Sequence, residues 1–344
     1  MNKKKQAQSS SPRDIQARTT TNANIESKIK IGISGCLLGR EVRFNGGHKR
    51  FRLCTDDWAD VFEFVPVCPE VEIGLPTPRE PIRLMETSPG QIDVVNVTDT
   101  TQVHTVQLRA LGLEKAKVMT DISGFIFTPK SPSCGLYGVK VYLKNGHPNG
   151  SRGGAFAESF RKANPLLPVE ESGRLNDPGL RENFMMRVFL YAKWQRLQQD
   201  GISAKSLLAF HSKEKLLVMA HCLVTYKKLG RLLADLRDKD VDSVADTYIH
   251  CLMLALSRPT TRARNANALS HIQGYLKRSL GGYEKQALAG IIDDYRCGRV
   301  PIVVPMTMLQ HLLQKHEDAR GGDYILSQSY LQPYPNDLGL RNAI

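Results

Sequence analysis

KIKIGISGCLLG, residues 28–39, is the stretch from which the fold can be argued. Its first part is short, rich in β-branched residues and closed by glycine, which is the pattern of a buried strand entering a tight turn. Similar runs follow at VFEFVPV (61–67), ISGFIFT (122–128) and VKVYL (139–143). A helical pattern between Thr105 and Met119 separates two of these runs. Strands that alternate with helices predict an α/β domain with a mainly parallel sheet.

The second half of the chain has a different pattern. Beyond Gly201 the strand signals disappear and helical periodicity dominates. We expect helices at residues 207–236, 241–256, 266–280, 283–295 and 306–316. The chain is therefore predicted to have three parts. They are a polar, basic tail expected to be disordered (1–28), an α/β domain (29–200) and an all-α domain (201–344).

Length and composition limit the classes of function. The chain has 344 residues, of which 41% are hydrophobic and 24% charged, and these values suit two globular domains. No apolar run approaches the roughly 20 residues that span a bilayer, and no apolar stretch follows the basic N-terminus as in a secretory signal. Seven scattered cysteines argue against a disulfide-stapled secreted protein. We expect a cytoplasmic protein with no membrane association, and no obligate protein partner is evident.

The positive charge is unevenly distributed. The net charge of +13 divides into +5 for residues 1–30, +2 for 31–200 and +6 for 201–344. Basic surfaces attract polyanions by releasing counterions, so the tail and the helical half are candidate contacts for nucleic acid. A solvated helix face that only keeps the protein soluble is the alternative.

Three cysteines each stand just past a predicted strand. Cys36 follows the first strand, Cys68 the second, and Cys134 lies a few residues after the third. Because the carboxyl ends of parallel strands meet at one edge of a sheet, we expect the three to converge. Three thiolates suit a [4Fe–4S] cluster with one open iron, a Lewis acid for a soft atom such as sulfur. Zinc bound by three thiolates and water is one alternative, and inert buried cysteines are another.

The other four cysteines have different surroundings. Cys222, Cys251 and Cys297 lie in helical, largely apolar stretches and are expected in the core. Cys54 lies outside any strand-end turn, and no role is assigned to it.

The segments around the three strand-end cysteines resemble the thiouracil desulfidase family, small α/β proteins with a [4Fe–4S] cluster. The resemblance rests on SGCLLGREVRFNGGHKR (34–50), VPVCPEVEIGLPTPREP (65–81) and SPSCG (131–135). It covers about residues 29–165.

The second half resembles another module, the YbgA-like helical domain. The matching segments are FHSKEKLLVMAH (210–221), HIQGYLK (271–277), YRCGRVPIVVPMTML (295–309) and QSYLQPYPNDLGLRN (328–342). The combination is similar to two-domain desulfidases that convert 4-thiouridine in transfer RNA to uridine.

The resemblance implies a site and a reaction. Cys36, Cys68 and Cys134 would hold the [4Fe–4S] cluster, whose open iron would bind the substrate's sulfur. A glutamate and a serine are also expected to act, and Glu70 and Ser131 match best, with Glu72 and Ser133 as neighbouring candidates. The implied function is non-redox, hydrolytic removal of sulfur from 4-thiouridine in transfer RNA, with sulfide leaving through the open iron.

Three alternatives remain open at this point. The first is an enzyme that acts on free thiouracil or thiouridine. The second is a nucleic-acid-binding module whose cysteines bind structural zinc, and the third is a zinc hydrolase with a three-cysteine site.

Overall fold

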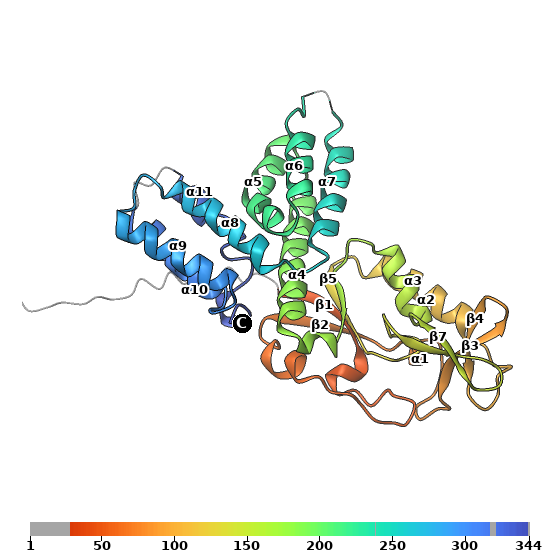
Figure 1. Ribbon diagram of the computed structural model, residues 1–344. Coiled ribbons are helices and arrows are strands. Elements are labelled where there is room, and N and C mark those ends of the chain that lie inside the picture. Colours follow the sequence, from red (N-terminus) through yellow and green to blue (C-terminus); the bar gives the residue numbers. More distant parts are fainter. Residues whose placement is uncertain (1–27, 238, 317–320, 343–344) are drawn as a thin grey trace, which may run out of the picture.

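The computed structural model describes residues 28–237, 239–316 and 321–342 (Figure 1). Its first part contains a four-stranded sheet in the order β2-β1-β5-β8, in which all neighbours are parallel. The strands are β1 (Ile29–Ser34), β2 (Phe62–Val67), β5 (Ile122–Phe127) and β8 (Val169–Glu171). The α/β part with a parallel sheet is therefore as predicted, whereas the predicted tail, apart from Lys28, lies outside the described residues.

Helices cover both faces of this sheet. Residues of α2 (Thr105–Val118) and α3 (Ala155–Ala163) share one buried cluster with Phe125 and Phe127 of β5. The long helix α4 (Pro178–Gln199) packs on the other face. A strand that is buried on both faces favours apolar side chains. Every residue of the β5 sequence ISGFIF is buried.

One glycine sets the spacing inside the sheet. A Cβ atom at Gly32 of β1 would lie 2.3 Å from a ring carbon of Phe125, closer than real Cβ contacts allow. The glycine therefore makes room for the Phe125 ring, which stacks on Phe127 with 4.2 Å between ring centroids.

A second sheet was not predicted from the sequence. Its order is β4-β3-β6-β7, in which β3 and β4 are antiparallel, β3 and β6 parallel, and β6 and β7 antiparallel. The strands are β3 (Ile82–Ser88), β4 (Gln91–Asn96), β6 (Val139–Tyr142) and β7 (Pro148–Arg152). The predicted strand at 139–143 exists but belongs to this second sheet.

The described residues beyond α4 form helices joined by loops. They are α5 (Ala204–His221), α6 (Leu223–Leu233), α7 (Val241–Leu256), α8 (Arg262–Tyr275), α9 (Gly282–Arg296), α10 (Val303–Lys315) and α11 (Gly322–Leu326). One prediction needs correction, because the single helix expected at 207–236 is two helices. Cys222 has an extended backbone with φ −153°, and its sulfur accepts the Thr225 N–H at 3.5 Å as the cap of α6.

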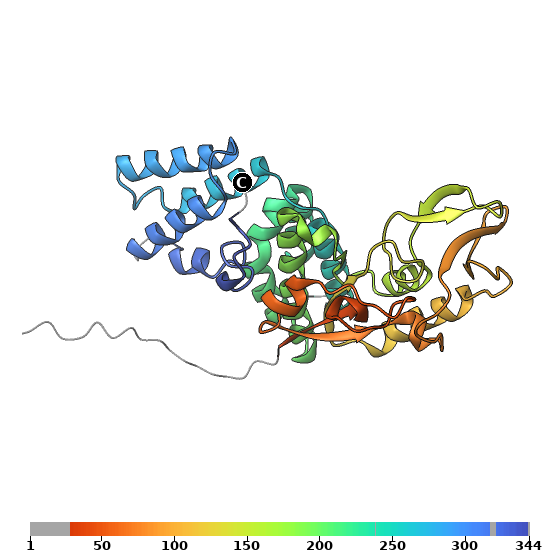
Figure 2. The same ribbon diagram turned by 90° about the horizontal axis from the view of Figure 1, so that it is seen from below.

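Helix α4 joins the two halves of the molecule. It runs between the parallel sheet and the helices α5 to α7 (Figures 1 and 2). One continuous apolar core extends from Ile31 and Ile33 of β1 across α4 to Tyr248 of α7 and Leu309 of α10. The domain boundary expected at residues 200 and 201 remains a prediction. Within the described residues, no helix combines the length and apolar character that crossing a bilayer requires.

Candidate active site

Three of the loops that follow strands of the parallel sheet each bring a cysteine to one cavity. Cys36 lies in the 3₁₀ turn Gly35–Leu38 directly after β1, and Cys68 directly follows β2 and precedes α1 (Pro69–Glu72). Cys134 lies in the loop after β5. All three line a cavity of about 350 Å³. The structure thus brings together the three residues that the strand pattern singled out.

The three thiols are desolvated. Burial raises the pKa of Cys36, Cys68 and Cys134, and for Cys134 the carboxylate of Glu70 and the neighbouring thiol of Cys36 raise it further. The Cys36 sulfur lies 3.0 Å from the Thr128 hydroxyl, which lowers the Cys36 pKa in part. A metal that replaces the thiol proton supplies the positive charge that such buried thiolates need.

The donor set consists of thiols, which are the protein ligands of iron–sulfur clusters. A zinc ion draws its ligands to about 2.3 Å for sulfur, so three donors would crowd around one point. Throughout the part of the chain that the structure describes, no three or more His, Cys, Asp or Glu side chains are so arranged that they could hold one metal ion. In a [4Fe–4S] cluster each cysteine binds a different iron, so the sulfur atoms stand farther apart. Three soft donors that line one cavity suit such a cluster.

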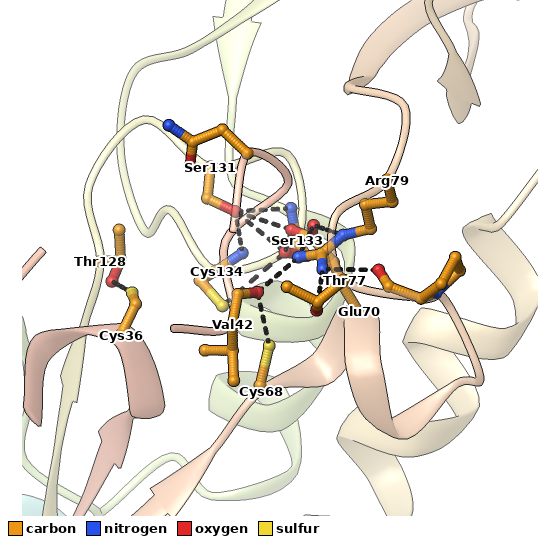
Figure 3. A network of polar contacts seen from close by, with 12 residues as sticks. Cys36, Val42, Cys68, Glu70, Thr77, Arg79, Thr128, Ser131, Ser133 and Cys134 are labelled. Atoms are coloured by element: carbon orange, nitrogen blue, oxygen red, sulfur yellow. Dashed lines mark hydrogen bonds and ion pairs between the residues drawn. The ribbon is translucent and has the colours of Figure 1, made fainter. Parts of the chain in front are cut away.

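A network of polar contacts forms one wall of the cavity (Figure 3). Arg79 Nε and Nη2 donate to Oε2 of Glu70 at 2.9 and 2.7 Å, and the Arg79 side chain is only 5% exposed. The other carboxylate oxygen of Glu70 accepts the Ser133 hydroxyl at 2.5 Å. Arg79 Nη2 also donates to the Val42 carbonyl at 2.9 Å. One oxygen of Glu70 is thus fixed by an arginine, while the other faces the serines.

Two serines connect the cavity to the buried network. Ser131 lines the cavity, and its hydroxyl oxygen accepts the N–H of Cys134 at 3.1 Å. Ser133 is fully buried and lies 2.9 Å, oxygen to oxygen, from Ser131. The contacts form a continuous path from Ser131 through Ser133 to Glu70, along which a proton can move. Ser133 is the link that the sequence pattern left as a neighbouring candidate.

Glu72, the other candidate carboxylate, is committed elsewhere. It accepts the Cys68 N–H at 3.1 Å and pairs with Lys115 of α2 at 2.7 Å. It is not among the residues that line the cavity, whereas Glu70 is. The two neighbouring glutamates therefore differ in position, and only Glu70 borders the space that the cysteines share.

Two cations and an aromatic ring stand on the loop that follows Cys36. Arg43, Phe44 and Lys49 all line the cavity, and the Arg43 guanidinium lies 5.7 Å from the centre of the Phe44 ring. Backbone bonds hold this loop in place, with Lys49 N–H donating to the Cys36 carbonyl at 2.9 Å and Arg79 N–H to the Phe44 carbonyl at 2.7 Å. An anionic substrate would meet both positive charges beside the cysteines.

The remaining cysteines lie away from this cavity, and one prediction about them was wrong. Cys297, expected in the core, is exposed at the end of α9, while Cys222 and Cys251 are only partly buried. Cys222 and Cys297 occupy helix ends, where side chains face solvent more than in the middle of a packed helix. Cys54 is fully buried, and burial raises its pKa.

Comparisons with known proteins cover both halves of the chain. Residues 31–172 match the family model described as 2-thiouracil desulfurase, and residues 215–335 match the one described as "Protein of unknown function (DUF1722)". The uncharacterized protein YbgA of Escherichia coli (strain K12) is 30% identical over 163 residues, which are 47% of this chain and 94% of YbgA. The solved structure of the [4Fe-4S]-dependent thiouracil desulfidase TudS is 29% identical with a TM-score of 0.31, over 44% of this chain and 95% of that chain.

Proposed function

We propose that this chain, which belongs to the family of YbgA and carries a 2-thiouracil desulfurase domain at residues 31–172, removes sulfur from 4-thiouridine in transfer RNA. The overall reaction consumes one water and releases one hydrogen sulfide, while the carbon–sulfur double bond becomes carbon–oxygen. No net electron transfer is required.

The proposal assigns Cys36, Cys68 and Cys134 as ligands of a [4Fe–4S] cluster. This assignment is supported by the chemistry of the donor set, which is three soft donors around one cavity, with Cys36 and Cys134 buried and Cys68 partly buried. Held by these three ligands, such a cluster would have one iron without a protein ligand and would supply a Lewis acid for the sulfur of the substrate.

Glu70 is proposed as the general base. Its Oε2 is held by Arg79, so Oε1 and the two serines remain to handle protons. Glu70 takes a proton from the water that attacks the carbon, and Ser131 on the cavity wall orients that water. The path from Ser131 through Ser133 returns protons to the departing sulfide or to the ring nitrogen. General acid–base catalysis of this kind typically contributes about 10²–10⁴-fold.

Transfer RNA as the substrate is supported by charge. Arg43 and Lys49 border the cavity, where a phosphate beside the thiolated base would lie. On the helical side, Lys227, Lys228 and Arg231 form an exposed row on α6, and within the described residues none of them has an ion pair. We propose that this row binds the RNA backbone while one base leaves its stack to reach the cysteines.

The observation that carries the proposal is the meeting of three cysteines from three strand ends with the Glu70 network in one cavity. The test is anaerobic reconstitution of the 344-residue protein with iron and sulfide, followed by incubation with transfer RNA that contains 4-thiouridine. We expect loss of 4-thiouridine, gain of uridine and release of sulfide in equal amounts. A fully loaded protein that leaves 4-thiouridine intact would contradict the proposal.

Free thiouracil or thiouridine is the second candidate substrate. Its support is the family model at residues 31–172, whose description names 2-thiouracil, and a cavity of about 350 Å³ that is large enough for one base. Turnover of the free base, the free nucleoside and whole transfer RNA by the same preparation decides between the candidates. Higher kcat/KM for transfer RNA supports the first, and equal or higher kcat/KM for the free compounds supports the second.

A further inference from the structure

A second cavity, of about 360 Å³, lies in the other half of the molecule and shares no lining residue with the cysteine cavity. It forms where the start of α4 meets α5, α8, α9 and the C-terminal segment. That segment returns to α4 (Figure 1), and Arg341 Nε donates to Oε1 of Glu182 at 3.0 Å. The proposed desulfidation uses no residue of this cavity.

The inner wall of this cavity carries three buried polar side chains with hydrogen-bonding capacity left over. Asn183, His221 and Tyr295 are 8, 6 and 6% exposed, and all three line the cavity. Each uses one polar group within the protein. Asn183 Nδ2 donates to the Leu256 carbonyl at 3.1 Å, His221 Nδ1 lies 3.1 Å from the Arg258 carbonyl, and the Tyr295 hydroxyl accepts Asn265 Nδ2 at 2.9 Å.

The hydrogen-bond partners of these side chains determine which donors and acceptors remain for a ligand. A carbonyl oxygen can only accept, so His221 Nδ1 carries the proton. Burial lowers the pKa of His221 to about 4, so the ring is neutral near pH 7 and Nε2 is an acceptor. Asn183 uses one of its two amide hydrogens on the Leu256 carbonyl, and its oxygen is a second acceptor, while Tyr295 keeps a hydroxyl hydrogen to donate. Across the described parts of the chain, these three groups have no protein partner.

The rest of the lining suits a planar ring and an anion. Met186 and Leu217 supply buried apolar surface. Arg262 borders the cavity at the start of the 14-residue helix α8, and no ion pair joins it to any other described residue. Helix N-termini and an unpaired arginine attract phosphate.

The two acidic residues of the lining have partners within the protein. The Asp177 side chain caps α4 by accepting the Leu180 N–H at 2.9 Å, and Glu182 forms an ion pair with Arg341. Of the two arginines that line the cavity, Arg262 is the one without an ion pair to another described residue.

We propose that this cavity binds a nucleotide whose base carries an amino group, namely adenine, guanine or cytosine, with its phosphate at Arg262. The two acceptors receive the amino hydrogens or a neighbouring ring N–H, and Tyr295 donates to a ring nitrogen or a carbonyl. Uracil offers a single Watson–Crick-edge donor between two acceptors, so it matches this wall less well. The nucleotide is either free in solution or part of an RNA chain. This inference does not rest on the proposed desulfidation.

The test measures equilibrium binding of AMP, GMP, CMP and UMP to the 344-residue protein, and binding of an unthiolated transfer RNA in a parallel series. We expect at least one of AMP, GMP and CMP to bind ten or more times tighter than UMP. If none of the four free nucleotides binds, but the cavity variants weaken binding of transfer RNA, the cavity recognises the nucleotide as part of an RNA chain.

Two variants make the test specific. Gly179→Leu places a side chain at the cavity, and Asp177 Oδ1, at 3.4 Å, is the one neighbour that its Cβ would meet. His221→Asn keeps a donor for the Arg258 carbonyl and removes the Nε2 acceptor. Each should weaken binding at least tenfold. Gly290→Leu is the matched control, because its Cβ on α9 meets nothing within 4 Å and it does not line the cavity.

Thermal unfolding distinguishes a loss of binding from a loss of folding. Leucine is a better helix former than glycine, so both glycine variants should unfold at or above the temperature of the unmodified protein. Unchanged affinity for nucleotides and for RNA in Gly179→Leu, or the absence of any binding by the unmodified protein, would overturn the proposal. Equal affinity for UMP and the other three would overturn the assignment of an amino-bearing base.

Discussion

The two cavities of this molecule are built in opposite ways. At the parallel sheet, the cysteines lie within a few residues of three strand ends, so the backbone alone brings them to one edge. In the helical half, Asn183, His221 and Tyr295 come from α4, α5 and α9, and only the packing of whole helices brings them together. The first arrangement is local and readable from sequence, whereas the second exists only in the folded protein.

The largest effect is expected when one cysteine is removed from the cysteine cavity. Cys68→Ser removes one of three soft donors, so we expect iron content after anaerobic reconstitution to fall sharply and sulfide release to fall below detection. Cys297→Ser is the matched control, because that thiol is exposed at the end of α9. Full iron loading and activity in Cys68→Ser would show that the three cysteines do not act as one ligand set.

The next effect distinguishes two neighbouring carboxylates. Glu70→Gln should lower kcat by about 10²–10⁴-fold while iron content stays unchanged, because the base is lost and the ligands are not. Glu72→Gln keeps the cavity wall intact, since Glu72 faces Lys115. Single-turnover rates of both variants measure the difference. A greater loss in Glu72→Gln than in Glu70→Gln would reverse the assignment.

The helical half is expected to act through charge. Replacing Lys227, Lys228 and Arg231 together by alanine should weaken transfer RNA binding. It should also lower the dependence of log Kd on log salt by about 1 for each phosphate that these side chains neutralise. Turnover of the free thiolated base should stay unchanged. Binding titrations over a series of salt concentrations check this, and an unaltered salt slope would assign RNA binding to another surface.

A smaller loss is expected at the serine path. Ser133→Ala removes one hydrogen bond to the Glu70 carboxylate, which at about 1.4 kcal/mol corresponds to a tenfold drop in kcat. Ser133→Thr keeps the hydroxyl and should restore part of the rate. If Ser133→Ala loses nothing while Ser131→Ala does, protons bypass the buried serine.

The last effect changes no rate and concerns the pH dependence of stability in the helical half. Burial, together with smaller contributions from Arg264, Arg187 and Arg341, holds the pKa of His221 at about 4 in the folded state against 6.5 when exposed. The unfolded chain binds more protons between these values, so this contribution is complete above pH 6.5 and is lost as the pH falls toward 4. Between pH 7 and pH 5 the loss is about 2 kcal/mol.

The measurement that checks this is the free energy of unfolding in urea at both pH values. His221→Asn should show a smaller decrease between pH 7 and pH 5 than the unmodified protein, because it has no imidazole to titrate. An equal decrease in both proteins would mean that His221 is not held neutral.

The same contrast, between positions set by local sequence and positions set by packing, explains which features could be predicted from the sequence. Cys36, Cys68 and Cys134 could be placed together because parallel strands end at a common edge. The positions of Ser131 and Ser133 could not be told apart, since only the folded loop places Ser131 at the cavity and buries Ser133 against Glu70. The second sheet escaped prediction because its strands pair partly as antiparallel hairpins around polar residues. The break at Cys222 is set by a side-chain cap inside an otherwise helical pattern.

The central claim is that three cysteines and Glu70 form one hydrolytic desulfidation site. It is tested most directly by following sulfide and uridine together, in protein reconstituted without oxygen and supplied with transfer RNA containing 4-thiouridine and with ¹⁸O-labelled water. We predict one sulfide released and one labelled oxygen gained for each 4-thiouridine consumed. Sulfide release without the label in uridine, or no release from protein that carries its iron, would contradict the claim.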